Sequence, residues 1–557
     1  MRRRVVRRCG RPNRQNDHVI ASPTNRPATD ADHVREACGV VGVHTRGPVA
    51  VARLTYLGLF ALQHRGQEAA GMAVSDGDTL TVVKDQGLVA SVFDDRTLAG
   101  LTGHLAIGHC RYSTTGSSTW RNAQPAYRSV GEQMFALGHN GNLVNTEKLA
   151  ADAGMLEGTV TSDSDLVAEL IAAELSIDLA AEELADLGAP VVPAEDGPRG
   201  RLERAVASVV RRLEGAYSFV IMDEARVIGV RDPNGFRPLC LGRLNAPDAP
   251  AAPADALDTP DSAGDDRGGW VLASETPALD IVGATFVREL EPGEMVVIDD
   301  AGVRSLRPHG ADAGVPRLCL FEFVYFARPD SRLYGQSVHQ ARIRMGEQLA
   351  EQAPVDADMV MGVPESGVPA AEGFSRRSGI PLGQGLVKNR YIGRSFIAPS
   401  QEMRAQAVRM KLNPLRENID GKRLVVVDDS IVRGTTQKQL VRMLREAGAR
   451  EVHLRITSPP VAWSCFYGID TGDRDELIAA QLDVDEIRSY LNLDTLAYLT
   501  LARLVEATGA AAAGFCDACF TGDYPVPVPV TLRKHVLESD GRPLDRHVQP
   551  ALDGTVA

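Results

Sequence analysis

The pattern of apolar and polar residues divides the chain into two regions. In the first region, short apolar runs typical of strands recur between turns, with helical spacing at 54–62 and from 162 onward. The clearest of these strand-like runs lie at 38–43, 216–222, 227–231 and 270–273. From about residue 317, buried-strand patterns alternate with helical segments, and the clearest runs lie at 358–363, 424–428 and 452–457. The first pattern is typical of an α+β unit with many antiparallel strands, and the second predicts a parallel α/β sheet.

Composition indicates where these regions begin and end. Residues 1–37 are rich in arginine, then polar, and show no periodicity, so we expect a disordered leader or a propeptide. Two further stretches are rich in Ala, Pro, Asp and Gly, which predicts disordered surface insertions near 186–202 and 244–268. The expected organisation is therefore a leader (1–37), a first domain (38–308), a second domain (309–530) and a weakly structured tail (531–557).

Bulk properties exclude several classes of protein. A chain of 557 residues is too long for one hydrophobic core. The net charge of −13 argues against a nucleic-acid partner, because phosphate backbones require a basic face. No apolar run reaches the ~18 residues of a membrane span. Eight cysteines are too sparse for a disulfide scaffold, and the arginine-rich start lacks the apolar segment of a signal peptide, so we expect a cytoplasmic protein.

The apolar run at 424–427 leads into two adjacent acids, Asp428 and Asp429, then a loop of small and hydroxyl residues, then a helix. This arrangement places free N–H groups and the positive end of a helix dipole where a phosphate can bind. Ligands of open α/β sheets bind at the carboxyl ends of the strands, so the acids lie where ring hydroxyls and a metal ion need acceptors. A strand and turn with solvated acids is the ordinary alternative.

The whole string 425–436, Val-Val-Val-Asp-Asp-Ser-Ile-Val-Arg-Gly-Thr-Thr, resembles the phosphoribosylpyrophosphate (PRPP) motif of type I phosphoribosyltransferases. The turn Val363-Pro-Glu-Ser-Gly resembles that family's pyrophosphate loop. The segment from Lys388 to Lys411 resembles its flexible loop, which we interpret as a lid. The resemblance implies Mg²⁺ at Ser366, Asp428 and Asp429. It implies PRPP contacts at Glu365, Ser366, Gly367, Lys388, Asp428, Asp429, Ser430, Arg433, Gly434, Thr435 and Thr436.

Cys38 begins the first apolar run, directly after the leader. If the chain were cut before Cys38, the thiol and a free α-amino group would share one residue. An α-amino pKa of roughly 7.7–8.0 makes that group a usable base near neutral pH, so no separate histidine would be needed. A buried cysteine on its own is more often a small apolar filler.

Cys38-Gly-Val-Val-Gly resembles the start of class II glutamine amidotransferases, which are N-terminal-nucleophile hydrolases. Three further strings match that family in order: Gly108-His-Cys-Arg-Tyr-Ser-Thr, His139-Asn-Gly-Asn and Ser162-Asp-Ser. The resemblance implies that Arg111 binds the carboxylate of glutamine and Asp163 its ammonium group. It also implies that Asn140 and Gly141 stabilise the oxyanion. Each string alone also fits an ordinary turn or cap, but four in this order favour the glutaminase.

Four cysteines of the second region are Cys319, Cys465, Cys516 and Cys519, the last two as Cys-Asp-Ala-Cys. Four thiolates suit either zinc or a 4Fe-4S cluster, and the residues alone do not choose between them. Their positions resemble those of the iron–sulfur branch of the amidophosphoribosyltransferase family, which implies a structural 4Fe-4S cluster. We assign no function to Cys9 or Cys240.

The resemblance to that family covers roughly residues 38–525 and implies both fold and reaction. The fold is an N-terminal-nucleophile glutaminase domain (an αββα sandwich) followed by an α/β type I phosphoribosyltransferase domain. The enzyme would release ammonia from glutamine and transfer it to PRPP, the first committed step of purine synthesis. The resemblance also implies feedback inhibition by purine nucleotides and a homo-oligomer, a tetramer. The alternatives are another class II amidotransferase, a non-catalytic PRPP-binding regulator and a redox sensor built on the cluster.

Overall fold

The structure is a computed structural model that describes most of the chain between Cys38 and Pro529. The described residues are 38–46, 50–112, 119–156, 158–185, 200–244, 268–310, 314–389, 411–469, 471, 473–510 and 514–529, with 178–185 described as backbone only. The predictions of a leader, a tail, a lid over 390–410 and most of both insertions concern residues outside these ranges.

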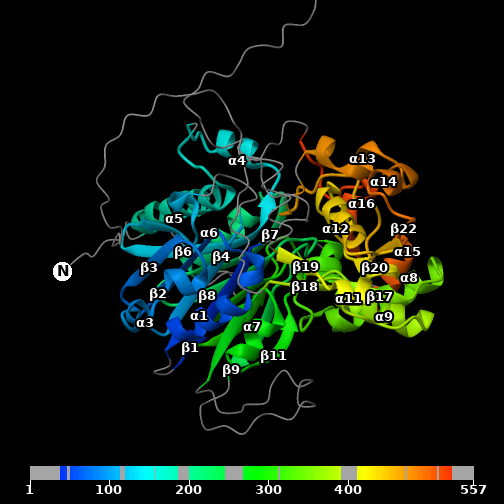
Figure 1. Cartoon of the computed structure of the whole chain (residues 1–557). Helices are drawn as coiled ribbons and strands as arrows, with labels where there is room; N and C mark the ends of the chain where they lie inside the picture. The colour runs from blue at the N-terminus through cyan, green and yellow to red at the C-terminus, as the bar shows by residue number, and fades with distance from the viewer. Residues whose placement is uncertain are drawn as a thin grey trace, which may run out of the picture.

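The first region folds into two antiparallel sheets packed face to face, on the left of Figure 1. The seven-stranded sheet has, in spatial order, β11 (Ala284–Glu289), β9 (Cys240–Leu244), β10 (Gly269–Ala273), β1 (Gly39–Thr45), β4 (Leu105–Arg111), β2 (Ala69–Ser75) and β3 (Leu80–Gln86). The six-stranded sheet has β13 (Gly302–Leu306), β12 (Met295–Asp299), β8 (Val227–Arg231), β7 (Gly215–Met222), β6 (Gln133–Leu143) and β5 (Ala126–Val130).

Alternation along the strands produces the layers. On β1, Val40 belongs to the core between the two sheets, whereas Val41 and Val43 pack under α1 (Val51–Ala61) and α7 (Thr276–Ile281). The outer face of the other sheet is covered by α5 (Asp163–Ala185) and α6 (Arg201–Val210). This αββα sandwich confirms the predicted fold. Its short connecting elements are η1 (Gln63–Arg65), α2 (Val89–Val92), α3 (Asp95–Ala99), η2 (Trp120–Asn122) and α4 (Thr146–Asp152).

The second region contains a parallel sheet in the order β17 (Met359–Gly362), β20 (Arg423–Asp428), β21 (Glu451–Ile456) and β22 (Thr495–Tyr498). Alternate residues of β20 face opposite cores, so the strand is buried on both sides. One core includes α8 (Val338–Gln352), α9 (Val368–Ser378) and α15 (Leu501–Thr508), and the other includes α12 (Thr435–Glu446) and α14 (Val484–Tyr490). This sheet, on the right of Figure 1, confirms the predicted α/β fold.

Shorter elements complete the second region. They are β14 (Leu318–Cys319) with β23 (Phe515–Cys516), β15 (Arg332–Leu333) with β16 (Gln336–Ser337), β18 (Leu386–Lys388) with β19 (Leu412–Pro414), the π-helix η4 (Glu322–Phe326), α11 (Arg416–Ile419), η5 (Arg474–Glu476), α13 (Ile478–Gln481) and α16 (Ala518–Thr521). One predicted boundary is wrong: the insertion assigned to 186–202 extends into α6, because Leu202 is fully buried in the core of the first region.

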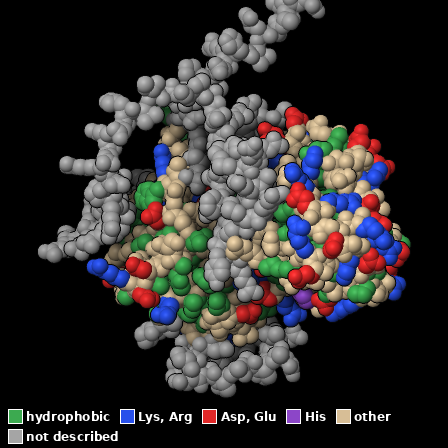
Figure 2. All heavy atoms as spheres, viewed as in Figure 1, with side chains coloured by type: hydrophobic (Ala, Val, Ile, Leu, Met, Phe, Trp, Pro, Cys, Tyr) green, Lys and Arg blue, Asp and Glu red, His purple; other side chains and the backbone are tan. Residues whose placement is uncertain are grey.

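The visible surface of the second region carries Lys, Arg, Asp and Glu side chains interspersed, so no field of one sign dominates that face (Figure 2). Hydrophobic side chains gather over α1 and α7 in the same view. Phe60 and Ile281 contribute there, with exposed fractions of 50% and 44%. Among the described residues, no helix is both long enough and apolar enough to cross a membrane.

Candidate functional site

Cys38 lies immediately before β1, at the edge of a small hollow between the two sheets. Its thiol donates a hydrogen bond to the carbonyl oxygen of Tyr112 at 3.3 Å, and the Tyr112 N–H approaches the sulfur at 3.4 Å. On the backbone side, the Arg65 Nε donates to the Cys38 carbonyl oxygen at 3.1 Å. The hollow is lined by Cys38, Arg111, Tyr112, Gln124, His139, Gly141, Ser162, Asp163 and Ser164.

The turn-like string at 139–142 lies inside β6 rather than in a hairpin, and it reaches the same hollow. Asn140 is fully buried, and neither its side-chain nitrogen nor its oxygen has a hydrogen-bond partner among the described residues. Gly141 has φ +149°, and a Cβ there would lie 2.1 Å from the Ala216 carbonyl oxygen, so only glycine fits. A buried amide without a partner is costly unless a ligand satisfies it, which is consistent with an oxyanion donor.

Asp163 begins α5 and is held from several sides. Its carboxylate accepts hydrogen bonds from the N–H of Ser164 at 2.8 Å and of Leu143 at 3.3 Å, and it lies 3.5 Å from His139 Nδ1. Burial alone would raise the pKa of Asp163, but His139 and these N–H groups lower it below its ordinary value. The carboxylate is therefore ionised at neutral pH and can bind an ammonium group.

The surroundings of Cys38 in this structure do not activate its thiol. Burial raises the pKa of the Cys38 thiol to about 11, and the Tyr112 N–H and Arg111 only partly offset this effect. The nearest ring in β4, His109, has a pKa lowered to about 3 by burial, and its Nε2 lies 2.9 Å from the carbonyl oxygen of His139. His109 is thus neutral and engaged with backbone. At neutral pH the thiol is protonated and needs an added base.

A second site forms where β17 and β20 end side by side. Asp428 and Asp429 are both about 1% exposed, and the Ser430 hydroxyl donates to Asp429 Oδ1 at 2.8 Å. Asp429 Oδ2 is buried without a hydrogen-bond partner among the described residues. Burial and the neighbouring Asp429 raise the pKa of Asp428 well above its ordinary value. Such a pair favours a bound cation, which would stabilise both carboxylates in their ionised form.

Loops on either side of the acids provide backbone for an anionic ligand. Gly434 has φ +77° and is the N-cap of α12, which begins at Thr435, so the N-terminus of this helix closely follows the strand that ends at Asp428. A Cβ on Gly367 would lie 2.2 Å from the Val427 carbonyl oxygen, so the loop after β17 lies directly against β20. Lys388 Nζ lies 3.4 Å from Glu365 Oε2 on this rim, where both side chains are exposed.

Not every predicted PRPP contact points into this site. The Arg433 guanidinium forms an ion pair with Glu476, with only 20% of its side chain exposed. Ser366 is half-buried in the loop after β17, and Thr436 is the second residue of α12, beside the buried Gln437. Gln437 donates to the Ser430 carbonyl oxygen at 3.0 Å, which fixes the loop between the acids and the helix.

The four cysteines predicted to bind a cluster come together between the two regions. β14 pairs with β23 in parallel register, which sets Cys319 opposite Cys516, and Cys519 and Cys465 pack against the same core. All are free thiols, and burial raises their pKa values, that of Cys319 to about 12. Within the part of the chain that is described, no group of three or more His, Cys, Asp or Glu side chains has the arrangement of a formed metal site.

The remaining cysteines contact backbone. Cys110 is buried under α1, and its thiol donates to the Leu62 carbonyl oxygen at 3.2 Å. The Cys240 thiol donates to the Ala273 carbonyl oxygen at 3.2 Å. Neither lies on the rim of the hollow beside Cys38. Cys9 lies outside the described residues.

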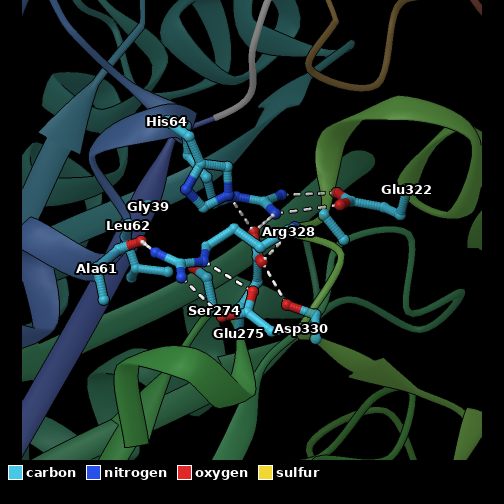
Figure 3. Close-up of polar contacts among 12 residues, drawn as sticks. Gly39, Ala61, Leu62, His64, Ser274, Glu275, Glu322, Arg328 and Asp330 are labelled. Carbon is cyan, nitrogen blue, oxygen red and sulfur yellow. Dashed lines mark hydrogen bonds and ion pairs between the residues drawn. The ribbon is translucent and has the colours of Figure 1, made fainter. Parts of the chain in front are cut away.

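Sequence reasoning missed several side chains of the first site. Tyr112 and Gln124 line the hollow, and Gln124 accepts from the His139 N–H at 2.7 Å and donates to the Ser164 hydroxyl at 2.9 Å. It also missed a buried ion cluster beneath Cys38, built from Arg65, Glu275 and Glu322 (Figure 3). Only the meeting of these three residues in space indicates a role.

Comparison with known proteins gives one consistent result. The phosphoribosyl transferase domain family matches residues 335–457. The amidophosphoribosyltransferase of Mycobacterium tuberculosis is 50% identical over 527 residues, covering 92% of this chain and 91% of that protein. The amidophosphoribosyltransferase of Bacillus subtilis is 43% identical over 518 residues, covering 91% of this chain and 98% of that protein.

Solved structures agree along the same length. A structure described as the allosteric regulatory enzyme of purine biosynthesis is 42% identical with a TM-score of 0.76, covering 90% of this chain and 99% of that one. The glutamine PRPP amidotransferase from B. subtilis, complexed with ADP and GMP, is 42% identical with a TM-score of 0.74, covering 90% of this chain and 100% of that one.

Proposed function

We propose which reaction each of the two sites catalyses, starting from the premise that this chain belongs to the amidophosphoribosyltransferase family. It is a glutamine amidotransferase and phosphoribosyltransferase of purine biosynthesis. The enzyme hydrolyses glutamine to glutamate and ammonia, and it transfers the ammonia to PRPP to give 5-phosphoribosylamine and pyrophosphate. The presence of both sites argues against another class II amidotransferase, and the complete glutaminase set argues against a regulator or a redox sensor.

The glutaminase reaction takes place in the hollow beside Cys38. Arg111 binds the α-carboxylate of glutamine and Asp163 binds its ammonium group, so the carboxamide carbon lies next to the thiol. The sulfur attacks this carbon, and the thiol proton passes to the leaving amine. Ammonia departs, which leaves a glutamyl thioester on Cys38. Water then releases glutamate and restores the thiol. The Asn140 amide and the Gly141 N–H stabilise the oxyanion of both tetrahedral intermediates.

Cleavage before Cys38 supplies the missing base. With a thiol pKa of about 11 in the uncut chain, very little thiolate exists at neutral pH. A free α-amino group on the same residue, with an ordinary pKa of roughly 7.7–8.0, would accept the thiol proton. The maturation of the enzyme is therefore removal of residues 1–37. This role explains why the only ring of β4 in this region, His109, is neutral and engaged with backbone.

The transferase reaction takes place at the end of β20. Residues 430–436 hold the 5′-phosphate, Glu365 to Gly367 and Lys388 contact the pyrophosphate, and Asp428 and Asp429 contact the ribose hydroxyls. Ammonia attacks C1 of the ribose as the C1–O bond to pyrophosphate breaks. Mg²⁺ fits here, because Asp429 Oδ2 is buried without a partner among the described residues. Mg²⁺ bound by Ser366, Asp428 and Asp429 would neutralise charge on the leaving pyrophosphate.

The four cysteines fit a 4Fe-4S cluster better than four unrelated core residues. Three of these thiols are buried and that of Cys465 is half-buried, and cluster ligation would remove their protons. The buried Arg237 partly offsets the effect of burial on the pKa values of Cys319 and Cys465, so it would balance the negative charge of a thiolate-bound cluster. The role we assign to the cluster is structural, since neither half-reaction transfers electrons.

Regulation and assembly complete the proposal. The B. subtilis relative was solved with ADP and GMP, which supports inhibition of this chain by purine nucleotides. A tetramer would cover exposed apolar side chains such as Phe60 and Ile281. The cytoplasm is the compartment that supplies PRPP and glutamine together.

One observation carries the glutaminase assignment: a single hollow is lined by Cys38, Arg111, Gly141 and Asp163. The test is to measure PRPP consumption with glutamine and with ammonia side by side, for wild-type enzyme and for Cys38→Ala. We expect the variant to lose glutamine-dependent turnover and to keep ammonia-dependent turnover. Loss of both activities would refute the division into two sites. Intact mass of the active enzyme checks maturation, since retention of residues 1–37 would contradict the role of the α-amino group.

A further inference from the structure

Glu322 lies at a position from which one carboxylate reaches both halves of the glutaminase site. It opens η4, whose Phe323 and Val324 pack in the core of the second region. Its side chain is fully buried between two guanidinium groups. Glu322 accepts hydrogen bonds from Arg65 Nη2 at 2.6 Å and Nη1 at 3.0 Å, and from Arg237 Nη1 at 3.1 Å.

On one side, this carboxylate is linked to the nucleophile. Arg65 directs its Nε to the Cys38 carbonyl oxygen at 3.1 Å while its two terminal nitrogens bind Glu322 and Glu275. Glu275 is itself held by His64 at 2.7 Å and by the Arg328 backbone N–H at 2.9 Å, as Figure 3 shows. Arg65 therefore has a single available orientation, and that orientation sets the position of the Cys38 backbone.

On the other side, the carboxylate is linked to the oxyanion strand. Arg237 donates through Nε to the Tyr467 carbonyl oxygen at 3.1 Å. The adjacent Phe466 carbonyl oxygen accepts from Asn142 Nδ2 at 2.9 Å. Gly468 has φ +101°, and a Cβ there would lie 3.0 Å from the Gly141 carbonyl carbon. The segment 466–468 is thus packed directly against the backbone of Gly141.

We infer that Glu322 is a positioning residue of the glutaminase reaction, which sets the Cys38 backbone through Arg65 and the oxyanion strand through Arg237 and the segment 466–468. This inference rests on the proposed function of Cys38, Asn140 and Gly141. Glu322 does not touch the bound glutamine.

The geometry explains why such a residue is needed. Cys38 precedes β1 of the seven-stranded sheet, whereas Asn140 and Gly141 belong to β6 of the six-stranded sheet. The described strands of the two sheets are not paired with each other, and a displacement of 1 Å between nucleophile and oxyanion donors costs about a hundredfold in rate. Two ion pairs on one buried carboxylate fix both groups to a common point outside the sandwich.

The test compares Glu322→Gln with a matched control, Glu203→Gln. Glu203 is also a fully buried carboxylate between two arginines, with Arg226 Nη1 at 2.9 Å and Arg304 Nη2 at 2.8 Å, but it lies on α6, outside the site. For Glu322→Gln we expect kcat for glutamine hydrolysis to fall about 10- to 100-fold with KM for glutamine within about threefold, because Arg111 and Asp163 still bind the substrate. Ammonia-dependent turnover should stay within about threefold of wild type.

A second variant acts at the far end of the same path. Gly468→Ala introduces a methyl group against Gly141 and should produce the same selective loss of kcat with unchanged metal content, together with a lower Tm, because φ +101° is strained for alanine. The rate of Cys38 alkylation by iodoacetamide, measured on every variant, reports the nucleophile directly and should fall in Glu322→Gln.

Equal kinetic losses in Glu322→Gln and Glu203→Gln, or wild-type glutaminase kcat in both Glu322→Gln and Gly468→Ala, would overturn the inference. These outcomes leave the proposed function intact, since that stands or fails with the Cys38→Ala result.

Discussion

Substitution of Asn140 distinguishes a catalytic from a structural role, because its expected effects on activity and on stability have opposite signs. The side chain is fully buried, and neither of its polar atoms has a hydrogen-bond partner among the described residues. Asn140→Leu keeps nearly the same volume and removes the amide. Activity should fall because the oxyanion loses a donor, whereas stability should rise because an unsatisfied polar group leaves the core.

Both magnitudes follow from the burial of the residue. Loss of one oxyanion donor lowers kcat by about 10²–10³, or about 2.7–4 kcal/mol in the barrier. An unsatisfied buried polar group costs about 1–3 kcal/mol, so the variant should be more stable than wild type by up to that amount. The matched control is Asn145→Leu. Asn145 is also buried but donates to the Arg212 carbonyl oxygen at 2.9 Å and accepts from the Glu214 N–H at 3.1 Å, so its loss should destabilise.

The assay measures glutamine-dependent and ammonia-dependent turnover, and thermal unfolding, for wild type and both variants. Asn140→Leu should lose only the glutamine-dependent rate and show a raised Tm, and Asn145→Leu should show a lowered Tm with the ratio of the two activities unchanged. A lowered Tm in Asn140→Leu together with equal loss of both activities would refute the assignment, because Asn140 would then be a structural residue of β6.

Three further outcomes are expected. Arg111→Lys should raise KM for glutamine about 10- to 100-fold with a smaller change in kcat, since an ammonium group cannot bind a carboxylate in bidentate fashion; an unchanged KM in steady-state kinetics would exclude this contact. Asp428→Asn should abolish transfer to PRPP yet raise Tm in the absence of Mg²⁺ and PRPP. The raised pKa of Asp428 means that the native state loses stability as pH rises above the ordinary Asp value near 3.9, so the Tm gain should grow as pH is raised from about 4, and a gain independent of pH would contradict the electrostatic cause. Protein purified without air should contain iron and sulfide bound by Cys319, Cys465, Cys516 and Cys519, and Cys519→Ser should lose both; zinc without iron in elemental analysis would rule out the cluster.

Much of the site could be predicted because its candidate residues lie in short contiguous segments of the sequence. The apolar run at 424–427 predicts a buried strand that ends at Asp428 and Asp429. The small residues after these acids then predict the loop before α12. The parallel sheet was predicted for the same reason, since β20 is apolar on both faces and its alternate residues enter two different cores. Local spacing carries this information, because strand burial and helix capping depend on neighbours in sequence.

The surroundings of these strings depended on contacts between residues far apart in the chain. Gln124 and Ser164 meet at the glutaminase site across 40 positions, and Arg65 and Glu322 meet across 257. The segment His139–Asn142, which on its own also fits an ordinary turn, lies within the continuous strand β6, where β7 pairs with it from Ala136 to Leu143. A pattern of apolar positions does not specify which strand pairs with which.

By itself, the sequence determined the two fold classes and identified Cys38, the acids Asp428 and Asp429, and the four cysteines of the second region as candidate site residues. Only the tertiary structure decided that a carboxylate of the second domain lies between the arginines behind Cys38 and Gly141. The physical reason is that a buried ion pair depends on strand order and on the packing of one domain against the other, and residues that are hundreds of positions apart leave no local pattern when they pair.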